Sequence, residues 1–159
     1  MEKIEKKLII FFEYRKTIMK TCSKIDFYKV CKIGDVQKVK FFLEKKKIDV
    51  HADDENGFNI ACKYGHLELV KFFLSLEGEQ KINVHAKEET PFRVSCEYGH
   101  LEIVKLLLSL EGDRRININI KNEHAFSLAC QHGHVEIVKL LLDIKDDRKI
   151  IVPIKDNYP

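Results

Sequence analysis

The sequence contains no tryptophan, only three prolines and seven glycines among 159 residues, and no long apolar run. So little glycine and proline excludes a collagen-like or low-complexity chain, and a hydrophobic content of 45% excludes a disordered one. Near the N-terminus the longest apolar run covers residues 8–12. That is far below the roughly 20 residues that span a bilayer, and too short for the core of a signal peptide. We therefore expect one domain that stays in the cytoplasm without membrane contact.

Basic residues are concentrated at the start of the chain. Residues 1–47 carry 14 lysines and arginines against 6 acidic residues, whereas residues 48–159 carry 14 against 19. The surplus of 8 and the deficit of 5 together give the net charge of +3. A basic segment can bind nucleic acid or an anionic surface. Its lysines alternate with apolar residues at helical spacing, however, so we favour a solvated helix face.

The chain contains an internal repeat. Residues 61–71, 95–105 and 129–139 align with a period of 34, and residues 30–40 form an earlier copy at an offset of 31. That offset is shorter because the connection after the first copy lacks three residues. A period of this length indicates a stack of similar structural units.

The pattern of residues within one repeat predicts two short antiparallel helices. Thr90 is a typical N-cap residue and Pro91 suits the first helical position, where its missing N–H costs nothing. Gly99 can end this helix because glycine tolerates a positive φ. His100 then begins a second helix, whose apolar face recurs through residues 103–108. Alternating residues predict short extended segments before each turn, at 48–50, 82–84 and 116–118.

Residues 1–22 do not follow the repeat. Ile4, Leu8, Phe11, Ile18 and Cys22 form an apolar stripe at helical spacing. A stack of repeats needs an atypical unit at its end. We therefore predict an N-terminal capping helix over residues 1–22.

A unit of turn, helix, glycine turn and helix in 34 residues resembles the ankyrin repeat. Residues 90–92 (Thr-Pro-Phe), the Gly-His pairs and the run at 101–108 carry the resemblance. Asn59, Arg93 and Ser127 replace the histidine that usually follows Thr-Pro-Leu. With its long loops and its many Lys and Ile residues, the sequence most resembles the ankyrin proteins of amoeba-infecting, mimivirus-like giant viruses. The resemblance implies an all-α solenoid at 23–159 with four repeats, approximately 24–50, 56–84, 90–118 and 124–152.

The cysteines and histidines do not predict an active site. Four cysteines share one repeat position, too far apart for disulfides, and zinc sites usually need paired ligands such as Cys-x-x-Cys, which the sequence lacks. Three histidines recur at the start of the second helices, where we expect capping and turn roles. The repeated cysteines are Cys31, Cys62, Cys96 and Cys130, and the repeated histidines are His66, His100 and His134. We therefore predict no enzyme, no metal and no cofactor.

The resemblance implies a binding surface made of the finger turns and of the two residues before each glycine turn. Exposed tyrosines on such a surface are frequent hot spots. Before the glycine turns lie Lys32 and Ile33, Lys63 and Tyr64, Glu97 and Tyr98, and Gln131 and His132. The predicted finger residues are Asp53, Asp54 and Glu55 in one repeat and Lys87, Glu88 and Glu89 in the next.

The expected function is non-catalytic binding of a host or viral protein. The alternatives are a nucleic-acid or anionic-surface binder that uses the basic N-terminal segment, and a degenerate paralogue without a partner. Tyr158 and Pro159 align with the start of a further repeat. We therefore expect the outer face of the fourth repeat to self-associate, or the chain to be a truncated copy of a longer array, unless the tail after residue 150 covers that face.

Overall fold

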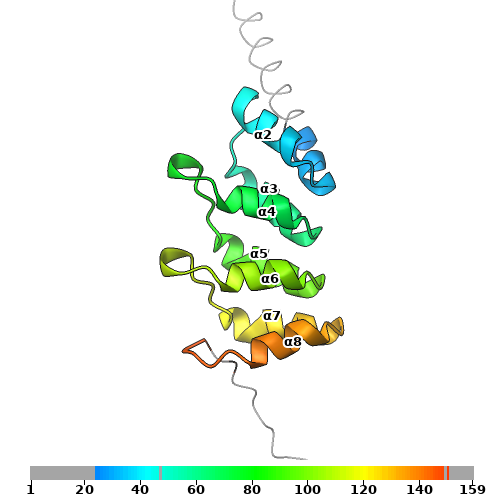
Figure 1. Ribbon diagram of the computed structural model, residues 1–159, viewed down its shortest axis with the longest axis vertical. Coiled ribbons are helices and arrows are strands. Elements are labelled where there is room, and N and C mark those ends of the chain that lie inside the picture. Colours follow the sequence, from blue (N-terminus) through cyan, green and yellow to red (C-terminus); the bar gives the residue numbers. More distant parts are fainter. Residues whose placement is uncertain (1–23, 47, 149, 151–159) are drawn as a thin grey trace, which may run out of the picture.

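A computed structural model describes residues 24–46, 48–148 and 150. Within these residues, helices follow one another in antiparallel pairs that stack into an elongated array (Figure 1). Short 3-10 turns, η1 (Gly78–Gln80) and η2 (Gly112–Arg114), lie in loops that project from one side of the stack. The all-α prediction is confirmed, and the described residues contain no strand. The pairs are helical residues 24–33 with α2 (Val36–Lys45), α3 (Ala52–Lys63) with α4 (Leu67–Leu74), α5 (Ala86–Glu97) with α6 (Leu101–Leu108), and α7 (Ile120–Gln131) with α8 (Val135–Leu142).

The core runs along the stack between the two layers of helices. α3, α5 and α7 pack side by side, as do α4, α6 and α8, and each first helix packs on its own second helix. Phe58 and Phe73 are fully buried and meet edge to face, with ring centroids 6.0 Å apart. Burying a side chain of this kind contributes about 1.5–3 kcal/mol. Because the helix layers continue from one repeat to the next, each repeat buries its apolar face against a neighbouring repeat.

The segments at 82–84 and 116–118, expected as short extended segments before a turn, form no strand, and buried and exposed residues alternate along them. Ile82, Val84, Ile116 and Ile118 are buried, whereas the residues between them are exposed. The apolar side chains therefore hold each connection against the core. The backbone N–H groups of Asn83 and Asn117, between them, donate to side chains of the preceding turn.

Two of the first helices, α3 and α5, begin with a left-handed turn that the sequence did not predict. In α5, Lys87, Glu88 and Glu89 have φ values of 49°, 58° and 60°, so regular helix begins only after Glu89. Thr90 is not a conventional N-cap: its hydroxyl donates to the carbonyl of Lys87 at 2.7 Å. The hydroxyl also accepts from Nη2 of Arg93 at 2.8 Å, so the residue that stands in place of the usual histidine binds the threonine hydroxyl. In α3 the turn at Asp53–Glu55 has the same left-handed conformation, and Asn59 donates to the carbonyl of Asp54 at 3.1 Å.

Candidate functional site

The predicted surface before the glycine turns is exposed along the stack. We call it the ladder: one pair of residues from each repeat, of which the second member forms a rung. Ile33 is 70% exposed, Tyr64 42% and Tyr98 44%, and His132 is also exposed. Large apolar side chains left in solvent along successive repeats are available for binding. The ladder consists of Lys32 and Ile33, Lys63 and Tyr64, Glu97 and Tyr98, and Gln131 and His132.

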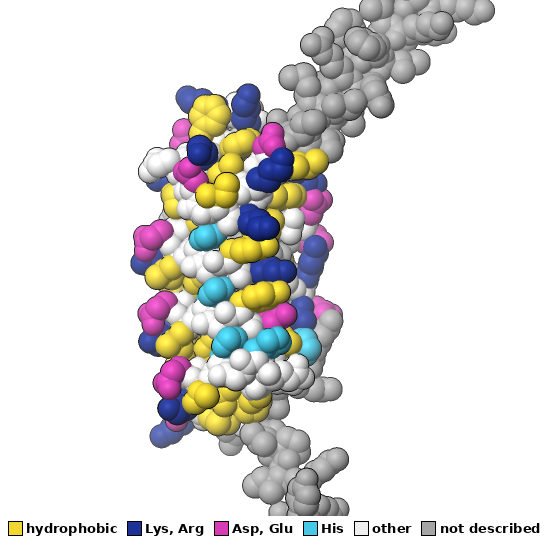
Figure 2. Space-filling view, turned by 90° about the vertical axis from the view of Figure 1, so that its right-hand side faces the viewer, with side chains coloured by type: hydrophobic (Ala, Val, Ile, Leu, Met, Phe, Trp, Pro, Cys, Tyr) yellow, Lys and Arg dark blue, Asp and Glu magenta, His cyan; other side chains and the backbone are white. Residues whose placement is uncertain are grey.

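Cation–π contacts link the two lysines of the ladder to the tyrosine rungs of the following repeats. The ammonium of Lys32 lies 5.0 Å from the ring centroid of Tyr64, and that of Lys63 lies 5.0 Å from the ring centroid of Tyr98. Each contact joins one repeat to the next and is worth about 0.5–1 kcal/mol at an exposed site. Figure 2 shows hydrophobic and basic side chains alternating down this face, followed by an acidic side chain and then by a row of histidines. The tyrosines are therefore held in place while part of each ring stays in solvent.

The repeated histidines position the ladder. His66, His100 and His134 stand at the N-caps of α4, α6 and α8, but none makes a side-chain cap bond. Their Nε2 atoms instead lie 2.7, 2.9 and 2.8 Å from carbonyl oxygens of the preceding repeat, which requires Nε2–H to donate. The expected capping role is therefore wrong. The accepting carbonyls belong to Lys32, Lys63 and Glu97, the ladder residues themselves.

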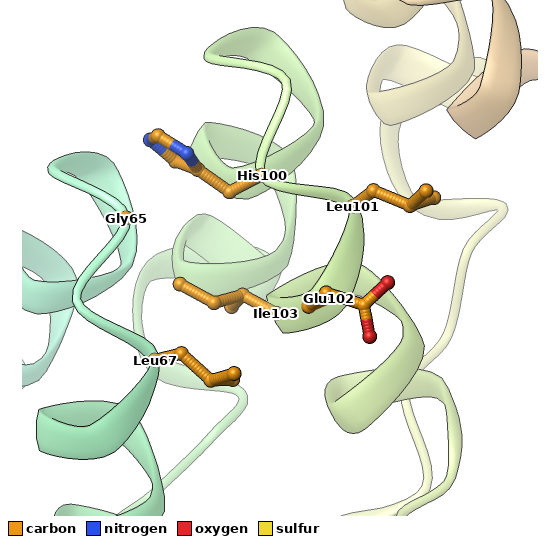
Figure 3. Close-up of a pocket in the computed structure, with 6 residues that line it drawn as sticks. All are labelled: Gly65, Leu67, His100, Leu101, Glu102 and Ile103. Carbon is orange, nitrogen blue, oxygen red and sulfur yellow. The ribbon is translucent and has the colours of Figure 1, made fainter.

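The same histidine rings explain the glycine turns. Gly65 and Gly99 have φ values of 76° and 77°, and a Cβ atom on Gly99 would lie 2.5 Å from Cε1 of His134. Figure 3 shows the ring of His100 directed toward the turn that holds Gly65. Glycine is therefore required for two reasons, the left-handed backbone and the close approach of the next repeat.

A shallow hollow of about 410 Å³ lies beneath this turn, between α4 and α6. Leu67, Leu101 and Ile103 line it, and its one carboxylate, Glu102, points away from His100 (Figure 3). That carboxylate is already paired with Lys105 at 2.8 Å. An equivalent hollow of about 310 Å³ follows one repeat later. Neither hollow brings together the groups that acid–base or nucleophilic catalysis requires.

Two of the predicted finger residues are not on the surface. Glu55 and Glu89 are only 3% and 2% exposed. The expectation that they lie at the binding tips is wrong, because the left-handed turn directs them inward. Each carboxylate oxygen Oε1 accepts a backbone N–H of the next connection, from Asn83 and Asn117 respectively, at 3.1 Å. The glutamates therefore tie each finger turn to the following one.

A histidine completes each of these junctions. Nδ1 of His51 lies 2.7 Å from Glu55 Oε1, and its Nε2 lies 2.7 Å from the carbonyl oxygen of Glu79. His85 repeats this arrangement with Glu89 and the carbonyl of Asp113, at 2.7 and 2.8 Å. Both ring nitrogens face acceptors, so both must donate, and the geometry fits an imidazolium paired with a buried carboxylate.

The pKa values of both histidines are raised, in agreement with this geometry. The hydrogen bond to Glu55 is the main cause for His51, helped by the Glu79 carbonyl and by the charges of Glu55 and Asp49. For His85, burial alone would lower the pKa, but the hydrogen bonds to Glu89 and to the Asp113 carbonyl outweigh it.

These raised pKa values predict that stability falls as the pH rises. A histidine with a folded pKa above the unfolded value of about 6.5 contributes its full stabilisation below pH 6.5 and loses it as the pH rises through the folded pKa. The urea midpoint should therefore decrease from about pH 6 to about pH 9. Urea titrations of a variant with His51→Gln and His85→Gln should show a flatter profile. An equally steep profile in that variant would exclude these histidines as the cause.

The exposed finger residues contact side chains and backbone of neighbouring repeats, in part each other. Asp53 binds the ammonium of Lys24 at 2.5 Å and the hydroxyl of Tyr28 at 2.8 Å. Lys87 donates to the carbonyl of Asp53 at 3.1 Å and lies 3.8 Å from the carboxylate of Asp54. Glu88 is exposed and also has a partner. Part of the charge of the finger residues is therefore neutralised by ion pairs and hydrogen bonds within the protein.

The cysteines are packing residues in three of the four repeats. Cys31, Cys62 and Cys96 are buried, and burial raises the pKa of the Cys31 thiol to about 12. Cys130 differs because its side chain is exposed in the fourth repeat. Among the described residues, no group of three or more potential metal ligands lies together.

Several expectations concern parts of the chain outside the described residues. The capping helix at 1–22 and the tail after 150 are among them. Val135 and Leu142 are 57% and 49% exposed in the fourth repeat, and self-association through this end stays a prediction. Every helix of the described segments is too short or too polar to cross a membrane.

Comparison with known proteins agrees with the repeat geometry. A family model described as ankyrin repeats (3 copies) matches residues 27–122 and, in an overlapping alignment, residues 58–152. Searches of curated proteins and of solved structures gave no match. The two alignments together cover well over half of the sequence, as do the stacked helix pairs. The chain therefore belongs to the ankyrin repeat family.

Proposed function

We propose that the protein is a non-catalytic module that binds a partner protein through the ladder and the exposed finger residues. The observation that carries this proposal is the exposure of Tyr64 and Tyr98, at 42% and 44%, on a surface held by contacts between repeats. Ankyrin repeats generally mediate protein–protein interactions. A rigid tyrosine offers a large contact area at little entropic cost.

The binding surface within this proposal consists of the ladder together with Asp53, Asp54, Lys87 and Glu88. Glu55 and Glu89 are left out because they are buried. The resemblance to giant-virus proteins makes a host or viral protein in the cytoplasm the proposed partner. A nucleic-acid site at the basic start of the chain is less well supported, because Lys24, Lys29 and Lys38 already lie within 3.3 Å of carboxylates.

A random peptide library, selected on the intact protein, tests this proposal without a known partner. The selected peptides should lose binding to a variant with Tyr64→Ala and Tyr98→Ala by about 1 kcal/mol or more for each tyrosine that is a hot spot. Helical circular dichroism should be unchanged, since both rings are partly in solvent.

Phe41→Ala is the matched control, because Phe41 is an aromatic side chain on α2 that is 50% exposed and lies outside the ladder. Peptides that bind the double tyrosine variant as well as they bind the wild type would overturn the proposal.

A further inference from the structure

We propose that the ladder recognises an acidic segment of its partner, in which two carboxylates three residues apart reach Lys32 and Lys63 and an apolar side chain between them packs on Tyr64. This inference rests on the proposed function and adds the chemistry of the partner. It concerns the first three repeats of the stack, where the two lysines lie beside exposed rings.

The lysines of the ladder differ from those on the second helices. Lys71, Lys105 and Lys139 each lie 2.7–2.9 Å from a glutamate three residues earlier, so their charges are largely compensated. Among the described residues, no carboxylate forms an ion pair with Lys32 or Lys63, and each ammonium lies instead against a tyrosine ring, while the charge of Glu97 acts on Lys63 from a greater distance. A cation above a ring, with one side in water, can still bind a carboxylate.

The geometry of the stack sets the spacing of the partner's carboxylates. Neighbouring packed helices lie about 8–10 Å apart, so equivalent lysines of adjacent repeats should be separated by about that distance. A peptide in the polyproline II conformation advances about 3.1 Å per residue with three residues per turn, so its side chains at i and i+3 lie on one face roughly 9 Å apart. Carboxylates at positions i and i+3 would therefore face Lys32 and Lys63 in turn. The ring of Tyr64 contacts Lys32 and directly follows Lys63 in sequence, which puts the apolar contact between the two charges.

The ladder pair of the third repeat, which contains Glu97, favours a short acidic segment over a nucleic acid as the partner. Glu97 occupies the position that Lys63 holds one repeat earlier. Its carboxylate would repel a third acidic group, and a phosphate backbone that continued along the stack would meet the same repulsion. A partner peptide can place a neutral or basic residue there, whereas each nucleotide carries a negative charge.

Short synthetic peptides test the spacing. One carries two glutamates at i and i+3 with leucine between them, one carries the same residues with the glutamates adjacent, and one has lysines in place of both glutamates. The intact protein should bind the first peptide about fivefold or more tightly than the second, and the third should not bind. Binding should weaken with added salt.

Charge exchange tests the assignment of the lysines. Lys63→Glu should weaken binding of the i, i+3 peptide about tenfold, and a peptide with lysine in place of the matching glutamate should recover binding to this variant. Lys105→Glu, an exposed lysine change on α6, is the matched control and should have little effect.

Other outcomes separate the inference from the proposed function. If library peptides depend on Tyr64 and Tyr98 but are neutral or basic, the acidic partner is wrong and the binding surface stands. If no peptide depends on the tyrosines, both fail. Tight binding of a short thymidine oligomer that Lys63→Glu abolishes would assign these lysines to nucleic acid and overturn the inference.

Discussion

Replacement of Glu89 by alanine is expected to lower the free energy of unfolding by about 2–3 kcal/mol. The carboxylate is 2% exposed and accepts hydrogen bonds from His85 and from the backbone of Asn117. Its loss leaves two buried or partly buried donors without their acceptor, and hydrogen bonds to a charged group are worth about 1.5–3 kcal/mol. Because His85 is partly exposed, we expect less than the roughly 3–5 kcal/mol typical of a fully buried ion pair. Urea unfolding of the intact protein measures the change.

Glu111→Gln is the matched control, since Glu111 is an exposed acidic residue in a loop. It should change stability by no more than about 0.5 kcal/mol. A double-mutant cycle with His85→Ala should show a clear coupling to Glu89. A loss as small as that of Glu111→Gln would mean that Glu89 is an ordinary surface residue, as a simple finger tip would be.

Gly99→Ala is expected to destabilise the protein by about 2–3 kcal/mol. A φ of 77° costs a non-glycine residue about 1–2 kcal/mol. The new Cβ would lie 2.5 Å from the ring of His134, so the ring must move and its hydrogen bond to the Glu97 carbonyl is lost. That bond is worth about 1 kcal/mol. Thermal or urea unfolding, combined with hydrogen exchange of the fourth repeat, measures the effect.

Gly112→Ala separates the two causes. Gly112 has a φ of 62°, and a Cβ atom added to it would meet no atom within 4 Å, so only the backbone penalty applies. The substitution should cost about 1–2 kcal/mol. Equal losses at positions 99 and 112 would show that the histidine ring adds nothing to the glycine requirement.

The fold could be predicted largely from the repeat because periodicity is a local property of the sequence. The apolar positions of residues 103–108, together with Gly99 and the period of 34, define two helices and the turn that joins them. The exposure of Tyr64 and Tyr98 followed instead from the resemblance to ankyrin repeats, which implies that the two residues before each glycine turn lie on the surface. Periodicity carries no information about a partner, so the role of these rings in binding is a separate proposal.

The finger junctions could not be predicted because they depend on a backbone conformation that short charged runs rarely adopt. Three successive residues with positive φ turn Glu55 and Glu89 inward, whereas a run such as Asp-Asp-Glu normally predicts an exposed turn. One signal was available. Glutamate recurs at 55, 89 and 123 while the two residues before it vary, and histidine recurs four residues earlier at 51 and 85. Cys130 is exposed although it shares its repeat position with three buried cysteines, because within the described residues the fourth repeat packs against one neighbouring repeat.

The most direct test of the binding surface is nuclear magnetic resonance of the intact protein with a library-selected peptide. The largest chemical-shift changes should fall on the rings of Tyr64 and Tyr98 and on the backbone of Lys32 and Lys63, the residues of the ladder. Changes centred instead on the outer face of α4 and α6, near Lys71 and Lys105, would contradict the proposed binding surface.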